Sequence, residues 1–343
     1  MRPMPRRYSS SSPGADDPLG TLLDTEAALA RAKAGLGRIS AAAAEAITAA
    51  CEPDRYDYNE VREFAEEHAT IVVPLVERIR LHVPEEHHHA IHTPATSQDI
   101  IDTALMLQAR RTLDHLVSAL DHCAGVVARL HTRYAAAPQL ARTLLQPALP
   151  TTFGNLLGSW QAGIDDARVR LGAVRGLRLA VQLGGPVGDL DDPELVGAFA
   201  AELTLAVPDR PWHTTRTRIV DLATALGLAV GALGKLGADV ILLSQAQIAE
   251  LSEGSAGHSS SMPDKRNPAR AVQLVALAQR TPGLVATVFA GLPQELHRAA
   301  GRWQSEDPAV RELLTLAVAA VRHATVLLDG LQVHPDRMKV NLR

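Results

Sequence analysis

Three hydroxyl groups, a cation and an amide stand close together between residues 257 and 268. The segment reads Gly-His-Ser-Ser-Ser-Met-Pro-Asp-Lys-Arg-Asn-Pro. Lys265 can neutralise a carboxylate, Asn267 can donate to one, and a serine hydroxyl can approach a carbon-bound proton. Gly254 and Gly257 give the backbone the freedom of a mobile loop that closes over a dianionic substrate. The alternative is a solvated linker between two helices.

A second polar segment precedes an expected long helix. Thr96 or Ser97 can cap this helix, and Gln98 follows them. The free N–H groups at such a helix start favour a carboxylate. The alternative is a loop that only caps the helix.

A histidine and an arginine stand before the longest expected helix. His213 is a possible acid or base, because a free imidazole has a pKa near 6.5. Arg216 can hold a carboxylate through two parallel hydrogen bonds. The alternative is a structural His–Arg pair at a helix start.

The composition indicates a helical globular protein. Of 343 residues, 46% are hydrophobic, 21% are charged and only 3% are aromatic. This is helix-forming composition with few strand-favouring residues. The net charge of −4 gives no electrostatic case for nucleic acid. Two cysteines form neither a disulfide framework nor a metal quartet, so a reducing cytoplasm is expected.

Helical spacing covers almost the whole sequence. Shorter helices are expected at 19–35, 40–51, 58–67 and 72–82, and longer ones at 97–136, 152–177, 214–251, 268–297 and 308–331. Breaks near Pro282 or Pro293 are possible. The loops 87–97, 141–152, 182–192 and 253–268 are polar, and chemistry is usually placed on such loops.

The apolar residues between 216 and 251 do not fall on one stripe, which indicates a helix buried on nearly all sides. Asp221, Lys235 and Asp239 argue against a membrane span. One subunit of this size would struggle to bury several such helices. We therefore expect an all-α long-helix bundle that other subunits complete, with a monomeric bundle as the alternative.

The serine segment resembles the signature Gly-Ser-Ser-x-Met-Pro-x-Lys-x-Asn-Pro of the fumarase/aspartase superfamily. Matching positions are Ser259, Ser260, Met262, Pro263, Lys265, Asn267 and Pro268. The resemblance implies that a serine of the pair, Ser259 first and Ser260 second, abstracts a proton next to a carboxylate. It also implies a homotetramer whose active sites each gather regions from three subunits. His258 departs from the pattern, where the family has Gly.

Other segments are similar to the 3-carboxy-cis,cis-muconate cycloisomerases of this superfamily. The stretch from His92 to Arg110 resembles His-Trp-Gly-Ala-Thr-Ser-Gln-Asp, which implies that Thr96, Ser97 and Gln98 contact substrate carboxylates. Trp-His-Thr-x-Arg at 212–216 and Glu-Leu-His-Arg at 295–298 fit the same group, so Arg298 joins the candidate binding residues. Pro94 replaces a family Gly, and Thr70 stands in a region where the family tends to have Gly-Asn.

The segment 141–154 separates the subfamilies. Adenylosuccinate and argininosuccinate lyases carry a His after an Arg-Thr pair, and this sequence has Leu144 there, as cycloisomerases have Trp or Leu. Thr143 and Gln146 are the candidate substrate contacts. The alternative is a Pro-bounded connection with buried Leu144 and Leu149.

The resemblance implies conversion of 3-carboxy-cis,cis-muconate to 4-carboxymuconolactone in the beta-ketoadipate pathway, without a cofactor. The enediolate-like intermediate would be stabilised by Lys265, Asn267, Arg216 and Thr143, with Ser259 or His213 moving the proton. One alternative is a lyase that releases fumarate from a succinyl adduct. Another is a non-catalytic superfamily relative.

Four parts are expected along the sequence: a disordered tail at 1–17, an N-terminal helical domain at 18–95, the long-helix bundle at 96–332, and at 333–343 a remnant of the linker to a C-terminal domain that the sequence lacks. The tail has no apolar core of a secretory signal. The run His87-His88-His89 with His92 raises a metal hypothesis, but consecutive histidines do not converge on one ion, so no metal is expected.

Overall fold

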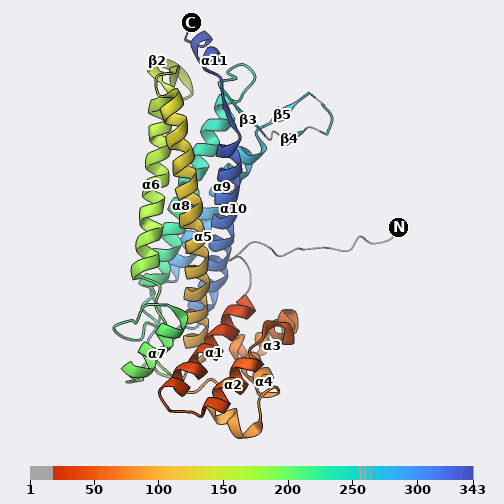
Figure 1. Ribbon diagram of the computed structural model, residues 1–343, viewed down its shortest axis with the longest axis vertical. Coiled ribbons are helices and arrows are strands. Elements are labelled where there is room, and N and C mark those ends of the chain that lie inside the picture. Colours follow the sequence, from red (N-terminus) through yellow and green to blue (C-terminus); the bar gives the residue numbers. More distant parts are fainter. Residues whose placement is uncertain (1–17, 255–256, 259, 263, 343) are drawn as a thin grey trace, which may run out of the picture.

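Long helices packed side by side form an elongated bundle in the computed structural model of the protein (Figure 1). The structure describes residues 18–342 apart from 255, 256, 259 and 263, and it leaves the side chain of His258 undescribed. The bundle helices are α5 (Ser97–Tyr134), α6 (Phe153–Leu177), α8 (Thr217–Leu243), α9 (Ala269–Ala290) and α10 (Arg302–Asp329). The all-α expectation is confirmed.

Helix α8 is the centre of the bundle and packs against α6, α9 and α10. Leu226, Leu233 and Val240 on one side of the helix are fully enclosed, but Leu228 on the other side is 52% exposed, so a single chain does not bury α8 on nearly all sides. Among the described helices it alone is long and apolar enough to cross a membrane, but half of its most apolar stretch is buried inside the protein. Lys235 and Asp239 pair on its surface. These features are those of a core helix.

The expected helix 214–251 is shorter in the structure, where it spans Thr217–Leu243. The chain then turns, with Ala249 at a φ of 50°, and the Glu250 N–H donates to the Leu243 carbonyl. Strand β3 (Leu251–Glu253) follows and pairs antiparallel with β6 (Leu331–Val333). The sequence predicted a longer helix because the apolar residues that follow Leu243 extend into strand β3.

A hairpin occupies most of the expected loop 141–152. Strand β1 (Pro138–Thr143) pairs antiparallel with β2 (Gln146–Thr152). Leu144 and Leu145 form its tip at positive φ values of 50° and 62°, and the Leu144 side chain is 97% exposed. The alternative in which Leu144 and Leu149 are buried is therefore wrong within a single chain.

Small helices gather at the opposite end of the bundle from this hairpin (Figure 1). They are α1 (Pro18–Gly35), α2 (Ala41–Ala50), η1 (Pro53–Arg55), α3 (Tyr58–His68), α4 (Val72–Arg80), η2 (Glu85–Ala90) and α7 (Pro193–Leu203). Ser40 caps α2 through its side chain. Helix α1 packs against both α5 and α7 and so joins this end to the bundle.

The last helices differ from expectation at their ends. Helix α9 stops at Ala290, seven residues before the expected end, and α10 starts at Arg302 rather than at Pro308. Pro282 and Pro308 both lie inside helices. Pro308 is the seventh residue of α10, beyond the four N-terminal positions whose N–H groups have no partner in the helix, so it removes one hydrogen bond from the helix. Strands β4 (Gly257–His258) and β5 (Arg266–Asn267) form a second hairpin that projects from the bundle, and α11 (Pro335–Val340) ends the described chain.

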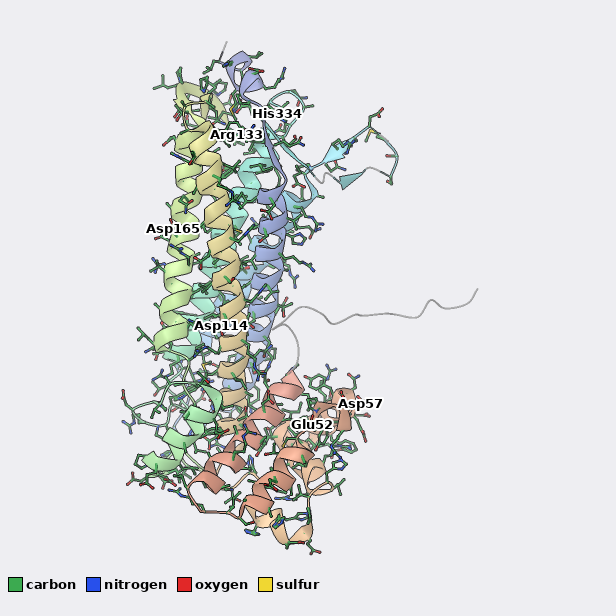
Figure 2. The ribbon with its side chains drawn as sticks, viewed as in Figure 1. Glu52, Asp57, Asp114, Arg133, Asp165 and His334 are labelled. Carbon is green, nitrogen blue, oxygen red and sulfur yellow. The ribbon has the colours of Figure 1, made fainter. Side chains whose placement is uncertain are left out.

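The length of the bundle separates its two ends. Helix α5 has 38 residues, which is about 57 Å at 1.5 Å per residue. Arg133, near its end, and His334 of the C-terminal segment lie at one end of the molecule, and both are far from Glu52 and Asp57 among the small helices (Figure 2). Residues at opposite ends of α5 therefore cannot meet within one chain.

Candidate active site

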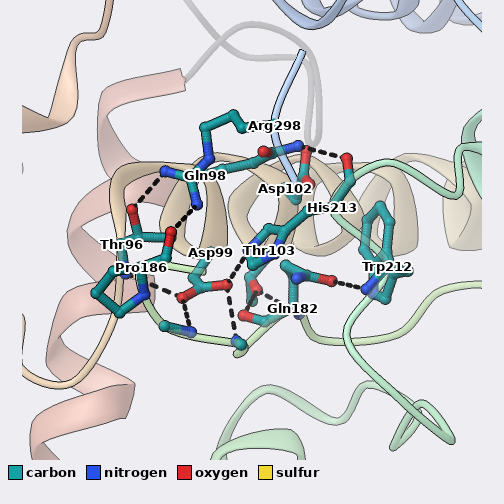
Figure 3. Close-up of polar contacts among 12 residues, drawn as sticks. Thr96, Gln98, Asp99, Asp102, Thr103, Gln182, Pro186, Trp212, His213 and Arg298 are labelled. Atoms are coloured by element: carbon teal, nitrogen blue, oxygen red, sulfur yellow. Dashed lines mark hydrogen bonds and ion pairs between the residues drawn. The ribbon is translucent and has the colours of Figure 1, made fainter. Parts of the chain in front are cut away.

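Polar residues from three segments meet at the first turn of α5 (Figure 3). Thr96 and Gln98 come from the helix start, His213 from the segment before α8, and Arg298 from the connection between α9 and α10. Gln98 is fully buried, and its Nε2 donates to the His213 carbonyl at 2.8 Å. Ser97, at the first position of α5, is partly exposed beside them. Five residues that the sequence singled out thus lie at one end of the bundle.

A buried imidazole–carboxylate pair forms the back of this cluster. His213 Nε2 lies 2.7 Å from Asp99 Oδ1, and the two side chains are 4% and 0% exposed. An ionised carboxylate only accepts hydrogen bonds, so Nε2 carries the proton. Nδ1 then has a free lone pair and no hydrogen-bond partner among the described residues. This is the arrangement of an imidazole that is held by an acid and can take a proton at its other nitrogen.

Backbone amides hold Asp99 in place. The N–H of Gly184 donates to Oδ1, and the N–H groups of Gly185 and Thr96 donate to Oδ2, all at 2.9 Å. A side chain at Gly184 would approach His213 Cε1 to 2.8 Å and Pro211 Cβ to 2.7 Å. Glycine is therefore required at 184 for the imidazole to reach Asp99.

Arg298 offers a cation to this cluster. Its Nη1 donates to Thr96 Oγ1 at 2.7 Å and its Nη2 to the Pro186 carbonyl at 3.1 Å. Its Nε is buried without a partner, and so is Gln98 Oε1. No carboxylate of the described residues pairs with this guanidinium. Together with Ser97 and the start of α5, it can bind a substrate carboxylate.

The structure corrects the expectation that Arg216 holds a substrate carboxylate. Its side chain is fully buried and binds Asp102 through Nη1 and Nη2 at 2.7 and 2.8 Å. Its Nε donates to Glu306 Oε1 at 2.9 Å, and Nη2 also reaches Glu306. Every nitrogen of the guanidinium is thus occupied by the protein, because two acids enclose it.

The remaining candidates lie at the other end of the bundle. Thr143 and Gln146 flank the tip of the β1–β2 hairpin and are exposed. Ser260 and Lys265 lie in the β4–β5 hairpin segment and are exposed, and Asn267 is partly buried in β5. Ser259, the first candidate for proton transfer, lies outside the described residues. One chain does not bring these residues to the Arg298 cluster.

Two buried acids tie these distant segments to the bundle. Glu250 accepts from Gln139 and Arg142 of β1, both at 2.8 Å. Glu253 accepts the N–H groups of Arg270 and Ala271 at 3.1 and 2.8 Å, at the start of α9. The hairpin with Thr143 and both ends of the serine segment are therefore anchored on β3.

Sequence reasoning did not assign roles to Asp99, Asp102 or Glu306. The spacing of Asp99 and Asp102 was a usable signal, because residues three apart share one face of a helix. Glu306 carried no such signal, since only the fold brings it to Arg216. Among the described residues, no three His, Cys, Asp or Glu side chains are arranged to hold a metal ion.

Comparison with protein families places the chain in a class. The family model described as lyase matches residues 13–283. The chain belongs to this lyase family, the fumarase/aspartase superfamily, and the expected family is thereby confirmed.

Individual relatives narrow this class. A 3-carboxy-cis,cis-muconate cycloisomerase of Pseudomonas aeruginosa is 41% identical over 332 residues, which covers 94% of this chain and 72% of that protein. A nitrosuccinate lyase of Streptomyces davaonensis is 37% identical, and the match covers 94% of this chain and 72% of that protein. The solved 3-carboxy-cis,cis-muconate lactonizing enzyme of Pseudomonas putida has a TM-score of 0.88 at 38% identity, covering 94% of this chain and 74% of that one.

Proposed function

We propose that the protein is a cycloisomerase that converts 3-carboxy-cis,cis-muconate to 4-carboxymuconolactone. The observation that carries the proposal is Arg298, which pairs with no acid of the described residues and lies beside the His213–Asp99 pair. The chain is also 41% identical to a cycloisomerase of that name. A tricarboxylate needs fixed cations and donors, and the start of α5 supplies a first carboxylate site.

The reaction is an isomerisation in which the ionised substrate takes up one proton, supplied by water through a catalytic acid. One substrate carboxylate oxygen bonds to a carbon of the double bond, and a proton is delivered to the neighbouring carbon. Arg298, Thr96 and Ser97 would hold one carboxylate and orient the substrate. His213, with Nδ1 available, would hold or deliver the proton, and Ser259 or Ser260 is the other candidate for that role.

The stabilising charge would come from other copies of the chain. Negative charge develops next to a carboxylate as the ring closes, and it requires donors fixed in advance. Lys265, Asn267, Thr143 and Gln146 offer a cation and hydrogen-bond donors, but they lie about a helix length from Arg298 in one chain. A homotetramer in the cytoplasm, with helices of neighbouring copies running in opposite directions, would bring both ends together.

The test is direct. The purified, assembled protein is mixed with 3-carboxy-cis,cis-muconate, and the loss of the conjugated diene absorbance is followed. We expect the protein to consume the muconate and to form the lactone, an isomer of the same mass. An assembled protein that leaves the muconate unchanged would refute the proposal.

A second candidate is elimination from a succinyl substrate, which the 37% identity to a nitrosuccinate lyase favours. Leu144 counts against the amine lyases of the superfamily, because it offers no acid at the hairpin tip. Release of fumarate from a panel of succinyl adducts, with no consumption of muconate, would favour this second function.

A further inference from the structure

Several side chains hold the segment that carries His213, and Arg216 is one of them. Arg216 Nη1 donates to the His213 carbonyl at 3.3 Å, beside the 2.8 Å bond from Gln98 Nε2. The Arg216 guanidinium also lies 5.0 Å from the centre of the Trp212 ring, over its face. Arg216 therefore contacts both the backbone of His213 and the ring of the preceding Trp212.

Arg216 is in turn clamped between two other helices. Asp102 on α5 holds it with two parallel hydrogen bonds, and Trp303 Nε1 donates to Asp102 Oδ1 at 3.4 Å. Glu306 on α10 accepts from Arg216, and its Oε2 accepts from Gln294 Nε2 at 3.2 Å. Asp102 lies one turn from Asp99, which holds the imidazole itself. Glu306 thus links α10 to Arg216 just before α8 and, through Arg216, to α5, which carries Asp99.

Arg216, Asp102 and Glu306 form a buried cluster of charges. Two acids face one guanidinium, and all three side chains are at most 1% exposed. Burial, together with Asp102 and Asp307, outweighs Arg216 and raises the pKa of Glu306 to about 7. Burial would lower the pKa of Arg216, but the two acids raise it. Removing Arg216 would leave two buried acids without compensation, whereas removing Glu306 leaves the Arg216–Asp102 pair balanced in charge and takes away only a hydrogen-bond acceptor.

We propose that Arg216 and Glu306 are positioning residues for His213, which place its imidazole for proton transfer without touching the substrate. The inference rests on the proposed function, in which His213 moves a proton. It adds a requirement that the site residues alone do not contain: the start of α10 must hold Arg216 for the imidazole to stay on Asp99.

Three variants test the clamp by steady-state kinetics on the assembled protein. In Glu306→Ala, Arg216 loses a hydrogen-bond acceptor. In Arg216→Lys, a single ammonium group replaces the planar guanidinium. Each variant is expected to lower kcat by about 100-fold, because a displacement of a catalytic group by about 1 Å can reduce the rate by that factor. KM should stay close to the wild-type value, because Arg298, Thr96 and Ser97 are untouched. Glu306→Gln keeps a carbonyl acceptor for Arg216 and is expected to restore most of kcat.

Glu312 supplies the matched control. It lies on the same helix and pairs with Arg280, but at the surface, so Glu312→Ala should leave kcat and KM unchanged. If Glu306→Gln is as slow as Glu306→Ala across the pH range, the charge rather than the position matters, and the proposal is wrong. A parallel change in kcat, KM and Tm for all variants would also overturn it, since that pattern indicates general damage.

A second measurement does not depend on activity. Diethyl pyrocarbonate modifies accessible imidazoles, and the modified histidines are identified by mass spectrometry. His213 is 4% exposed and should react slowly in the wild-type protein, while the exposed His115 serves as the internal reference. Glu306→Ala and Arg216→Lys should accelerate the His213 reaction by about tenfold, and Glu306→Gln should not. Unchanged His213 reactivity in the two disruptive variants would refute positioning, even if the muconate proves to be the wrong substrate.

Discussion

Arg216 and Arg298 show how surroundings decide what a guanidinium can do. Both lie close to His213, and both stood in segments that resemble the cycloisomerases. Arg216 is enclosed by Asp102 and Glu306 and has no capacity left for a ligand. Arg298 bonds only a hydroxyl and a carbonyl, and its Nε is unpaired. A neutral set of partners leaves its charge available, so Arg298 is the residue at this end that an anionic substrate would meet.

Replacement of Arg298 by Ala should weaken substrate binding. A hydrogen bond to a charged group contributes about 1.5–3 kcal/mol, so KM should rise by roughly 10- to 100-fold. Arg298→Lys should recover only part of this loss, because an ammonium cannot form two parallel bonds. The control is Arg55→Ala, an exposed arginine among the small helices. A KM that does not change in Arg298→Ala would exclude a carboxylate contact there.

His92 should make stability depend on pH. Its Nδ1 lies 2.7 Å from Oε1 of the buried Glu26. Burial lowers the pKa of His92, but the hydrogen bond and charge of Glu26 outweigh this and raise it above its usual value. A raised pKa in the folded state means that the stabilisation is complete below about pH 6.5, the unfolded value. It is lost as the pH rises through the folded value.

Urea unfolding from pH 5.5 to 9 of the wild type and His92→Gln measures this effect. The difference in unfolding free energy between the two proteins should be largest at the acid end and should shrink as the pH rises. Burial lowers the pKa of the neighbouring Lys33 to about 8, but Lys33 is present in both proteins. A difference that is constant with pH would contradict the assignment. His115→Gln, at an exposed position, should show no such trend.

The sequence identified residues by type better than by role. Thr96, Ser97, Gln98, His213 and Arg298 were singled out, and the fold brings them to one place. The pairing of Asp99 with His213 was not predicted, because the two residues are 114 positions apart. The burial of Arg216 was missed for the same reason: its partner Glu306 comes from a helix that no local pattern connects to it.

At the scale of elements, close packing of α8 against α9 depends on missing side chains. A Cβ on Gly237 would lie 2.9 Å from the Ala271 carbonyl oxygen and from Leu274 Cβ. Overpacking of this kind costs about 1–3 kcal/mol. Gly237→Val should therefore lower the free energy of unfolding by at least that amount, measured by urea denaturation.

Gly197 in α7 is the matched control for this prediction. A Cβ there meets nothing within 4 Å, so Gly197→Ala should be neutral or should stabilise the helix by about 0.5–1 kcal/mol. Equal stability of Gly237→Val and the wild type would show that the two helices can separate without cost.

Helices were predictable and their interruptions were not. Apolar spacing gave α5, α6 and α8 because a buried helix repeats its pattern over many residues. The hairpin β1–β2 escaped detection because strands of six and seven residues with prolines have no clear alternation. The end of α8 escaped because the apolar pattern continued into β3, whose Leu251 is also buried. Local propensity does not record where tertiary contacts replace one element by another.

At the scale of the molecule, one chain leaves surfaces that suit association. Leu228 on α8 and Phe289 on α9 are 52% and 57% exposed, although both lie on central bundle helices. The Arg298 cluster and the Lys265 segment are at opposite ends. Antiparallel packing of the helices of two copies would explain both observations. It would cover the exposed apolar residues, and it would bring the Arg298 cluster of one copy to the Lys265 segment of another.

Mixing two impaired variants tests this arrangement, with the substrate concentration kept far below KM. Arg298→Ala removes a group from one end and Lys265→Ala from the other, so each variant assembled alone should have little activity under this condition. If every site takes Arg298 from one copy and Lys265 from another, equal mixing with subunit exchange should give about a quarter of the sites both native groups. Activity should then return to about a quarter of the wild-type value. Two different substitutions at the same end, Arg298→Ala and His213→Asn, should not complement in this way, because both groups come from the same copy. No recovery in the first mixture, with exchange verified by mass spectrometry of labelled subunits, would show that the ends do not form a shared site.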